Sequence, residues 1–73
     1  MTDQTGHLSE PLFEFVRGHD RFLCELRYHG GYGVEARFYE NEEFVYSQRF
    51  DMRARAVQWA EEERKELEKG GDR

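Results

Sequence analysis

The main apolar side chains in the middle of the chain stand at even positions and alternate with polar residues. Three successive runs show this pattern: Phe22, Cys24, Leu26 and Tyr28, then Val34, Ala36 and Phe38, then Phe44, Tyr46 and Phe50. A period of two is typical of β-strands that bury one face. Because a one-residue slip exchanges the two faces, these strands must pair even with even. The pattern predicts an antiparallel meander.

The first loop of this meander is the glycine-rich segment at residues 29–33. A loop of this length sets Tyr28 opposite Val34. The same register brings opposite charges together on the other face, in the pairs Arg27–Glu35 and Glu25–Arg37, and such pairs stabilise a sheet. A turn that needs positive φ angles explains the glycines. Tyr32, at the tip of this turn, is predicted to be an exposed contact residue.

A helix is predicted after Phe50. Ala, Glu, Arg and Lys dominate this region and favour a helix, with Asp51 as the N-cap candidate and Gly70 as the glycine that ends it. The apolar face of the helix comprises Val57, Ala60 and Leu67, flanked by Ala56 and Trp59. One face of the sheet is therefore expected to pack against this helix.

The fold predicted from these elements is α+β: an antiparallel meander of three to four strands with one C-terminal helix packed on one face. Residues 11–16 are the candidate fourth strand, which either pairs within the monomer as an edge strand or swaps onto a neighbour. A single domain is expected over residues 11–69, after a disordered lead-in at 1–10 and before a frayed tail at 70–73. The predicted core comprises Phe13, Phe15, Phe22, Cys24, Leu26, Tyr28, Val34, Ala36, Phe38, Phe44, Tyr46, Phe50, Val57, Ala60 and Leu67, with Trp59 at its border.

The second loop, at residues 41–43, sets Phe38 opposite Tyr46 and forms two rows on the face turned away from the helix. One is a charged row of Arg27, Glu35 and Arg49, interpreted as a solvated ion-pair lattice. The other is an apolar row of Leu23, Tyr39 and Val45. Contiguous exposed apolar surface marks contact sites, so this row is predicted to bind a partner. The alternative is that Arg and Glu side-chain stems, or the N-terminal segment, cover it.

Composition narrows the classes of function. The chain has 73 residues and a net charge of −5, with no basic half that would indicate nucleic-acid binding. Its single cysteine, Cys24, fits a reducing compartment. A signal peptide and an apolar run of about 20 residues are both missing from the sequence. The expected location is the cytoplasm, without membrane contact.

Catalytic and metal-binding patterns are not found. The candidate metal ligands His7, His19, His29 and Cys24 are not spaced as in zinc sites. Cys24 faces the predicted core and is interpreted as a small buried hydrophobe. No cofactor, metal or enzymatic activity is therefore expected.

The segment from Val34 to Gly70 resembles a group of short, uncharacterised bacterial proteins. In that group a strand pair with a charged outer face runs into a helix that begins with a similar string. The matching residues are Phe50, Asp51, Arg53, Ala56, Trp59, Ala60, Glu61 and Arg64, while Met52 stands where Thr or Ser is usual. The resemblance implies strands followed by a helix and no known activity. Through Phe50, Ala56 and Trp59 the chain is also similar, more weakly, to the arm-type DNA-binding domain of phage integrases, which implies a sheet face that reads the major groove.

Two functions follow as hypotheses. The first is a small non-enzymatic interaction module, which self-associates as a homodimer or binds a protein partner through the outer sheet face or an edge strand. Its predicted contact residues are Leu23, Tyr39, Val45, Arg37 and Tyr32. The second is nucleic-acid binding through the sheet face and the arginines at the helix start, with Arg27, Arg49, Arg53 and Arg55 as the predicted contacts. The acidic net charge disfavours the second hypothesis.

Overall fold

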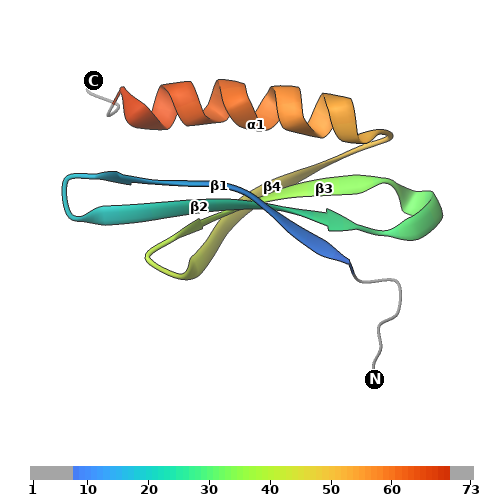
Figure 1. The fold of residues 1–73 in the computed structure, drawn as a ribbon, viewed down its shortest axis with the longest axis horizontal. Coiled ribbons are helices and arrows are strands. Elements are labelled where there is room, and N and C mark those ends of the chain that lie inside the picture. Colours follow the sequence, from blue (N-terminus) through green and yellow to red (C-terminus); the bar gives the residue numbers. More distant parts are fainter. Residues whose placement is uncertain (1–7, 70–73) are drawn as a thin grey trace.

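The computed structural model describes residues 8–69 and shows a four-stranded antiparallel sheet with one helix on one face (Figure 1). The elements are β1 (Ser9–Arg17), β2 (Asp20–Tyr28), β3 (Val34–Glu40), β4 (Glu43–Phe50) and α1 (Arg53–Glu68). The strands lie in the order β1-β2-β3-β4, so each pairs with its neighbour in sequence. The predicted α+β meander with one C-terminal helix is confirmed, with four strands in the sheet.

Strand β1 begins earlier than predicted. The lead-in was expected to extend to residue 10, but Ser9 and Glu10 already belong to β1, with Ser9 opposite Arg27. The backbone N–H of Tyr28 also donates to the carbonyl of Leu8 at 2.9 Å. Backbone pairing with β2 therefore extends the strand over Ser9 and Glu10, where the sequence shows no alternation of apolar and polar residues. The rest of the predicted lead-in, residues 1–7, and the predicted tail lie outside the described residues.

Helix α1 begins without the predicted cap. Its N-cap is Met52, which makes no side-chain hydrogen bond to the first turn. Asp51 lies one residue too early, and its carboxylate is 3.8 Å from the guanidinium of Arg55 instead. The prediction of Asp51 as the N-cap is therefore wrong, and the predicted terminal Gly70 lies outside the described part of the chain.

The register between β2 and β3 agrees with the parity argument. Tyr28 lies opposite Val34, and the charged residues are opposite one another as predicted. The central pairs of β3 and β4, Phe38–Tyr46 and Val34–Phe50, are also as predicted. The even positions of β2 and β3 consequently face α1.

The β3–β4 turn is one residue shorter than predicted, and this changes the local register. Asn41 and Glu42 form a two-residue loop with φ angles of 53° and 74°, as in a type I′ hairpin turn. Such a turn sets Tyr39 opposite Phe44. The register then shifts by one residue, and Val45 is the extra residue of a β-bulge. Phe44 thereby moves to the outer face.

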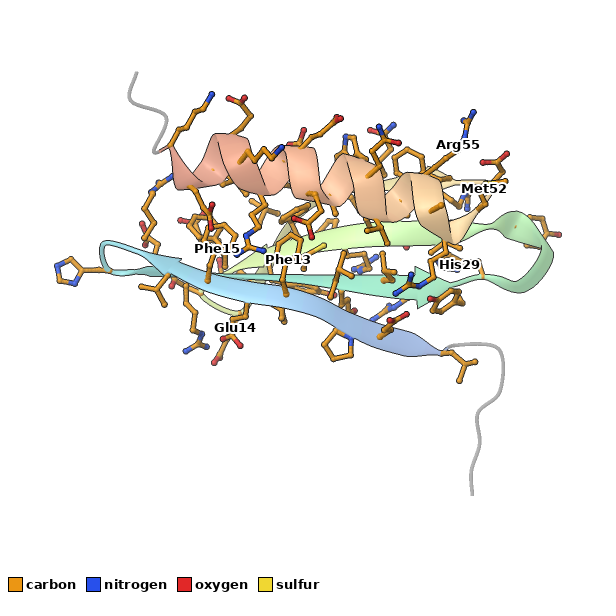
Figure 2. The ribbon with its side chains drawn as sticks, turned by 45° about the horizontal axis from the view of Figure 1, so that its top comes forward. Phe13, Glu14, Phe15, His29, Met52 and Arg55 are labelled. Atoms are coloured by element: carbon orange, nitrogen blue, oxygen red, sulfur yellow. The ribbon has the colours of Figure 1, made fainter. Side chains whose placement is uncertain are left out.

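The core lies between α1 and the central strands. It consists of Cys24, Leu26, Val34, Ala36 and Phe38 from the sheet with Ala56 and Ala60 from the helix. The two alanines let the helix approach β3 and β4 closely. On β1, Phe13 and Phe15 point toward α1 while Glu14 points away (Figure 2).

The predicted core is correct at its centre and wrong at one edge. Phe22 is buried, as are the five sheet residues of the core, and Trp59 is half-buried at the border. Phe44 and Tyr46 were predicted to be buried, but they are 49% and 36% exposed. The bulge at Val45 turns Phe44 away from the helix, and β4 lies at the edge of the sheet. These two residues therefore belong to the surface.

Candidate interaction surface

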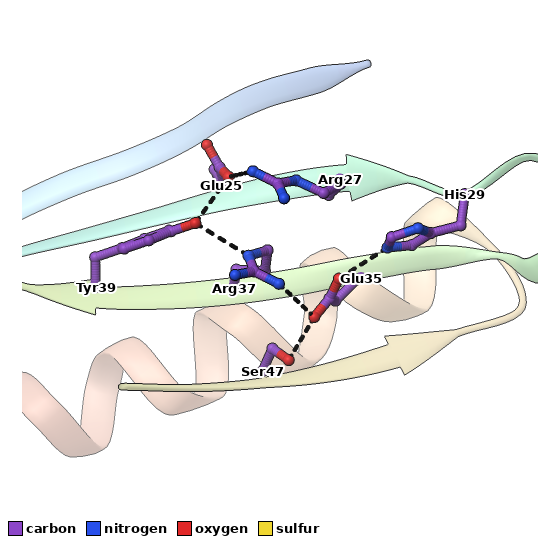
Figure 3. Close-up of polar contacts among 7 residues, drawn as sticks. All are labelled: Glu25, Arg27, His29, Glu35, Arg37, Tyr39 and Ser47. Atoms are coloured by element: carbon purple, nitrogen blue, oxygen red, sulfur yellow. Dashed lines mark hydrogen bonds and ion pairs between the residues drawn. The ribbon is translucent and has the colours of Figure 1, made fainter. Parts of the chain in front are cut away.

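A polar network covers the middle of the outer sheet face (Figure 3). Arg27 donates to Glu25 at 3.0 Å, and the hydroxyl of Tyr39 donates to the same carboxylate at 3.1 Å. The Tyr39 hydroxyl also accepts a hydrogen bond from Arg37 Nε at 3.0 Å. Arg37 in turn donates to Glu35 at 3.0 Å. The residues predicted as cross-strand charge pairs are opposite in register, but their ion pairs run along each strand.

Glu35 has three polar partners at the end of this network. Ser47 Oγ donates to it at 2.6 Å, His29 Nε2 lies 2.8 Å from Oε1, and Arg37 completes the set. Burial raises the pKa of Glu35, but the hydrogen bonds from Ser47 and His29 and the charge of Arg37 together hold that pKa below its ordinary value. In a catalytic triad the histidine stands between serine and carboxylate. Here the carboxylate stands in the middle, so His29 is not placed to accept the proton of Ser47.

Replacing Glu35 by glutamine is expected to make the free energy of unfolding depend less on pH at acid pH. A depressed carboxyl pKa contributes stability that is present above about pH 4.5 and is lost as the pH falls through the folded-state pKa. Glu35→Gln should therefore cost about 1–3 kcal/mol at pH 7 and lose less further stability between pH 5 and pH 3 than wild type. Urea unfolding at a series of pH values measures both effects. Glu66→Gln, at a carboxylate that is 72% exposed, is the control and should follow the wild-type profile.

The apolar row on the outer face differs from the predicted row at one position. Leu23 lies opposite Tyr39 as predicted, but Tyr39 lies opposite Phe44 and not Val45. The rings of Tyr39 and Phe44 meet edge to face, with centroids 6.0 Å apart. The guanidinium of Arg37 lies 4.4 Å from the centroid of Phe44, a cation–π distance. The pairing of Tyr39 with Val45 is therefore wrong, because the type I′ turn and the bulge place Phe44 in that row.

Exposed apolar side chains follow one another at the start of β4. Phe44, Val45 and Tyr46 are 49%, 51% and 36% exposed. Phe44 lies on the outer face, Tyr46 lies on the helix side, and Val45 is the bulge residue between them. Sequence parity assigned two of these residues to the core. The signal that could have located Phe44 is the Asn41-Glu42 pair, since a two-residue turn changes the register by one residue. Tyr46 keeps its predicted place opposite Phe38 and is exposed because β4 is an edge strand.

The two edge strands of the sheet differ in how they are protected. Both edge strands carry a register irregularity, β1 at Leu12 and β4 at Val45. Only β1 also carries a proline, Pro11, which has no backbone N–H to donate to a further strand. β4 contains no proline, and within residues 8–69 it has a strand neighbour on one side only, β3. The free edge of β4 is therefore the more open of the two.

Tyr32, a predicted contact residue, lies apart from the row. It ends the short 3-10 turn Gly30–Tyr32 and is 79% exposed. It lines a shallow hollow of about 330 Å³ with Arg49, Phe50 and Asp51, at the opposite end of β4 from Phe44. The structure therefore does not join Tyr32 to the Leu23–Tyr39–Phe44 row.

The arginines predicted to contact nucleic acid are divided between two places. Arg27 and Arg49 lie on the outer face, while Arg53 and Arg55 stand at the start of α1. Three of the four are near carboxylates, in the pairs Arg27–Glu25 at 3.0 Å, Arg53–Glu10 at 2.8 Å and Arg55–Asp51 at 3.8 Å. These contacts favour an ion-pair role for the arginines over phosphate binding.

The remaining reactive groups form no site in the described part of the chain. Cys24 is fully buried, and burial raises the pKa of its thiol to about 12, which suppresses the nucleophilic thiolate. Residues 8–69 contain no cluster of three or more His, Cys, Asp or Glu side chains placed to hold a metal ion. Over the same residues, no helix has the length and apolar content to cross a membrane.

Comparisons of the chain with protein-family models, with curated proteins and with solved structures find no match.

Proposed function

We propose that the protein is a non-enzymatic interaction module that self-associates by pairing the free edge of β4 with the same edge of a second copy. The observation that carries this proposal is the run of exposed apolar residues Phe44, Val45 and Tyr46 on an edge strand without proline. An unpaired strand edge offers a row of backbone donors and acceptors to another strand. Exposed apolar side chains on both sides of that edge add surface that association would bury.

The outer-face row belongs to the same surface. Phe44 is both the last member of the Leu23–Tyr39–Phe44 row and the first exposed apolar residue of β4. The centre of the outer face is occupied by the polar network, in which Arg37, Tyr39 and Glu25 are hydrogen-bonded to one another within the chain. The edge is therefore favoured over the flat centre of the face as the place of contact.

The proposal predicts that a charge at Val45 weakens association. The wild-type protein should sediment at twice the mass of the 8.8-kDa chain at high concentration. Val45→Glu places an acidic side chain beside the edge and should weaken dimerisation about tenfold or more. Sedimentation equilibrium over a wide concentration range measures this.

The matched control is Val16→Glu. Val16 is also an exposed valine, at 65%, but it lies on the protected edge strand β1. The control should dimerise as wild type does. A wild-type protein that stays monomeric at every concentration, or equal weakening by the two substitutions, would overturn the proposal.

A further inference from the structure

Helix α1 lies beside the free edge of the sheet as well as above its core. Its contacts with the sheet are made mainly to β3 and β4. The indole of Trp59 packs against the rings of Phe50 and Tyr46 on β4, with centroids 5.7 Å and 6.0 Å away. Trp59 therefore stands over the stretch of β4 that is centred on Gln48. A second copy that pairs through β4 would bring its own α1 next to this helix.

The two flanks of α1 differ in how their charges are satisfied. On the flank toward β1, Arg53 pairs with Glu10 at 2.8 Å, and the guanidinium of Arg64 lies 5.0 Å from the ring centroid of Phe13. On the flank toward the β4 edge, Arg55 is 67% exposed and its nearest carboxylate is 3.8 Å away. Arg53 and Arg64 on the β1 flank thus already have partners within the chain.

The β4 flank carries two opposite charges at matching positions around a hollow. Arg55 and Glu62 are seven residues apart, which places them on the same side of the helix two turns from one another. Together with Phe50, Gln58 and Trp59 they line a hollow of about 310 Å³. Within residues 8–69, Glu62 takes part in no ion pair.

We propose that α1 forms the second half of the dimer interface, packing antiparallel against α1 of the second copy with Arg55 opposite Glu62 of the partner subunit and the reciprocal pair beside it. This inference rests on the proposed function, because it assumes that the two β4 edges pair. It adds a helix–helix contact and a specific charge pairing to the contact between the β4 edges. Because Arg55 and Glu62 complement each other across a two-fold axis, the partner at this surface is another copy of this chain.

One two-fold axis satisfies both layers. The midpoint between Arg55 and Glu62 falls between Gln58 and Trp59, and Trp59 stands over the region of Gln48 on β4. An axis through Gln48 places Phe44 and Val45 beside the partner's Met52 and the partner's Asp51, which follow β4 in the chain. Within the paired strands it sets Tyr46 opposite Phe50 of the partner subunit. Both of these residues lie on the helix side, so the parity of the faces is kept and the aromatic row of the core continues from one copy into the next. An isologous contact of this kind is self-complementary, as two-fold dimers require.

The spacing of the layers also agrees with this arrangement. Neighbouring strands lie about 4.8 Å apart, and α1 covers β3 and β4. A helix axis above the space between β3 and β4 stands about one strand spacing from the two-fold axis, which runs beside the free edge of β4. The two helix axes are then roughly 10 Å apart, within the usual range of about 8–10 Å for packed helices. The two helices would be neighbours on one face of a continuous eight-stranded sheet.

Charge reversal on the helix tests this arrangement. Arg55→Glu and Glu62→Arg each create two like-charge contacts in the dimer and should weaken dimerisation about tenfold or more. The double variant Arg55→Glu with Glu62→Arg restores opposite charges in the reverse order and should return the dimerisation constant to within about threefold of wild type. Sedimentation equilibrium at low ionic strength measures all three variants, and added salt should reduce the differences between them.

A matched control separates this pairing from a general effect of charge. Lys65→Glu makes the same change of charge as Arg55→Glu on an exposed part of the helix, and it should leave dimerisation unchanged. Dimerisation that survives both single reversals would overturn the helix pairing and leave the edge pairing of β4 in place. A double variant as weak as the singles would likewise overturn the pairing. A monomeric wild-type protein would overturn both proposals.

Discussion

Replacing Gly33 by alanine is expected to be among the most damaging single changes in the chain. Gly33 has φ 100° and ψ −160°, a backbone conformation that is essentially confined to glycine. A Cβ atom there would lie 2.2 Å from the carbonyl oxygen of Phe50. Relieving that clash requires the β2–β3 loop to move away from the end of β4. We expect a loss of about 3 kcal/mol or more, which lowers Tm by roughly 12–24 °C in a domain of this size.

Thermal unfolding by circular dichroism, at one fixed protein concentration, measures the effect of Gly33→Ala. Gly31→Ala is the matched control, because no atom lies within 4 Å of its added Cβ and its φ is not positive. This variant should unfold within about 0.5 kcal/mol of wild type. If both variants unfold at the wild-type temperature, the close approach of Gly33 to Phe50 is wrong.

Phe38→Ala is expected to remove most of the free energy of unfolding of the domain. Phe38 is fully buried in the central strand β3, and its ring packs against those of Phe13, Tyr46 and Trp59 at 5.9, 5.2 and 5.8 Å. Truncating a buried phenylalanine costs about 3–5 kcal/mol. Small domains have total stabilities near the lower end of about 5–15 kcal/mol, so the variant should be partly unfolded at 37 °C.

Urea unfolding followed by Trp59 fluorescence measures this loss, since Trp59 contacts the Phe38 ring directly. Val16→Ala, which truncates a side chain that is 65% exposed, should change the free energy of unfolding by no more than about 0.5 kcal/mol. A Phe38→Ala variant as stable as this control would show that the ring is not central to the core.

The register of the sheet could be predicted from parity because burial decides it. Leu26 and Ala36 are both fully buried and lie opposite one another. An alignment shifted by one residue would turn one of the two strands to the outer face, and the length of the loop at residues 29–33 selects among the alignments that remain. Parity cannot describe a place where burial and turn geometry disagree. The two-residue turn at Asn41–Glu42 demands one register and the pair Phe38–Tyr46 demands another. The bulge at Val45 accommodates both registers by adding one residue to β4. Strict alternation of side chains between the two faces does not include such an extra residue.

The pairing within the outer-face row could be predicted for β2 and β3 but not for β4. Tyr39 and Leu23 are neighbours on the outer face, as parity required. Phe44 and Tyr46 were assigned to the core because their spacing matches that of the buried strands, yet a strand at the sheet edge buries less on either face. Whether a strand lies at the edge or in the centre of a sheet depends on the number and order of the strands. The alternation of residues within one strand does not indicate this. The Arg55–Glu62 flank was missed for a related reason, since only the packing of Trp59 identifies which side of α1 faces the free edge.

The order of the strands also has a kinetic consequence. Every strand pairs with its neighbour in the chain, through loops of two or five residues, so no pairing requires a long segment to close. Loop-closure entropy is small for such short connections, and chains dominated by local contacts cross their folding barrier quickly. Asn41 also ties the β3–β4 turn to the start of β2, because its side-chain oxygen accepts a hydrogen bond from the backbone N–H of Arg21 at 2.9 Å. Each hairpin can therefore form before the helix docks, and the apolar edge of β4 spends little time beside unfolded chains that would pair with it wrongly.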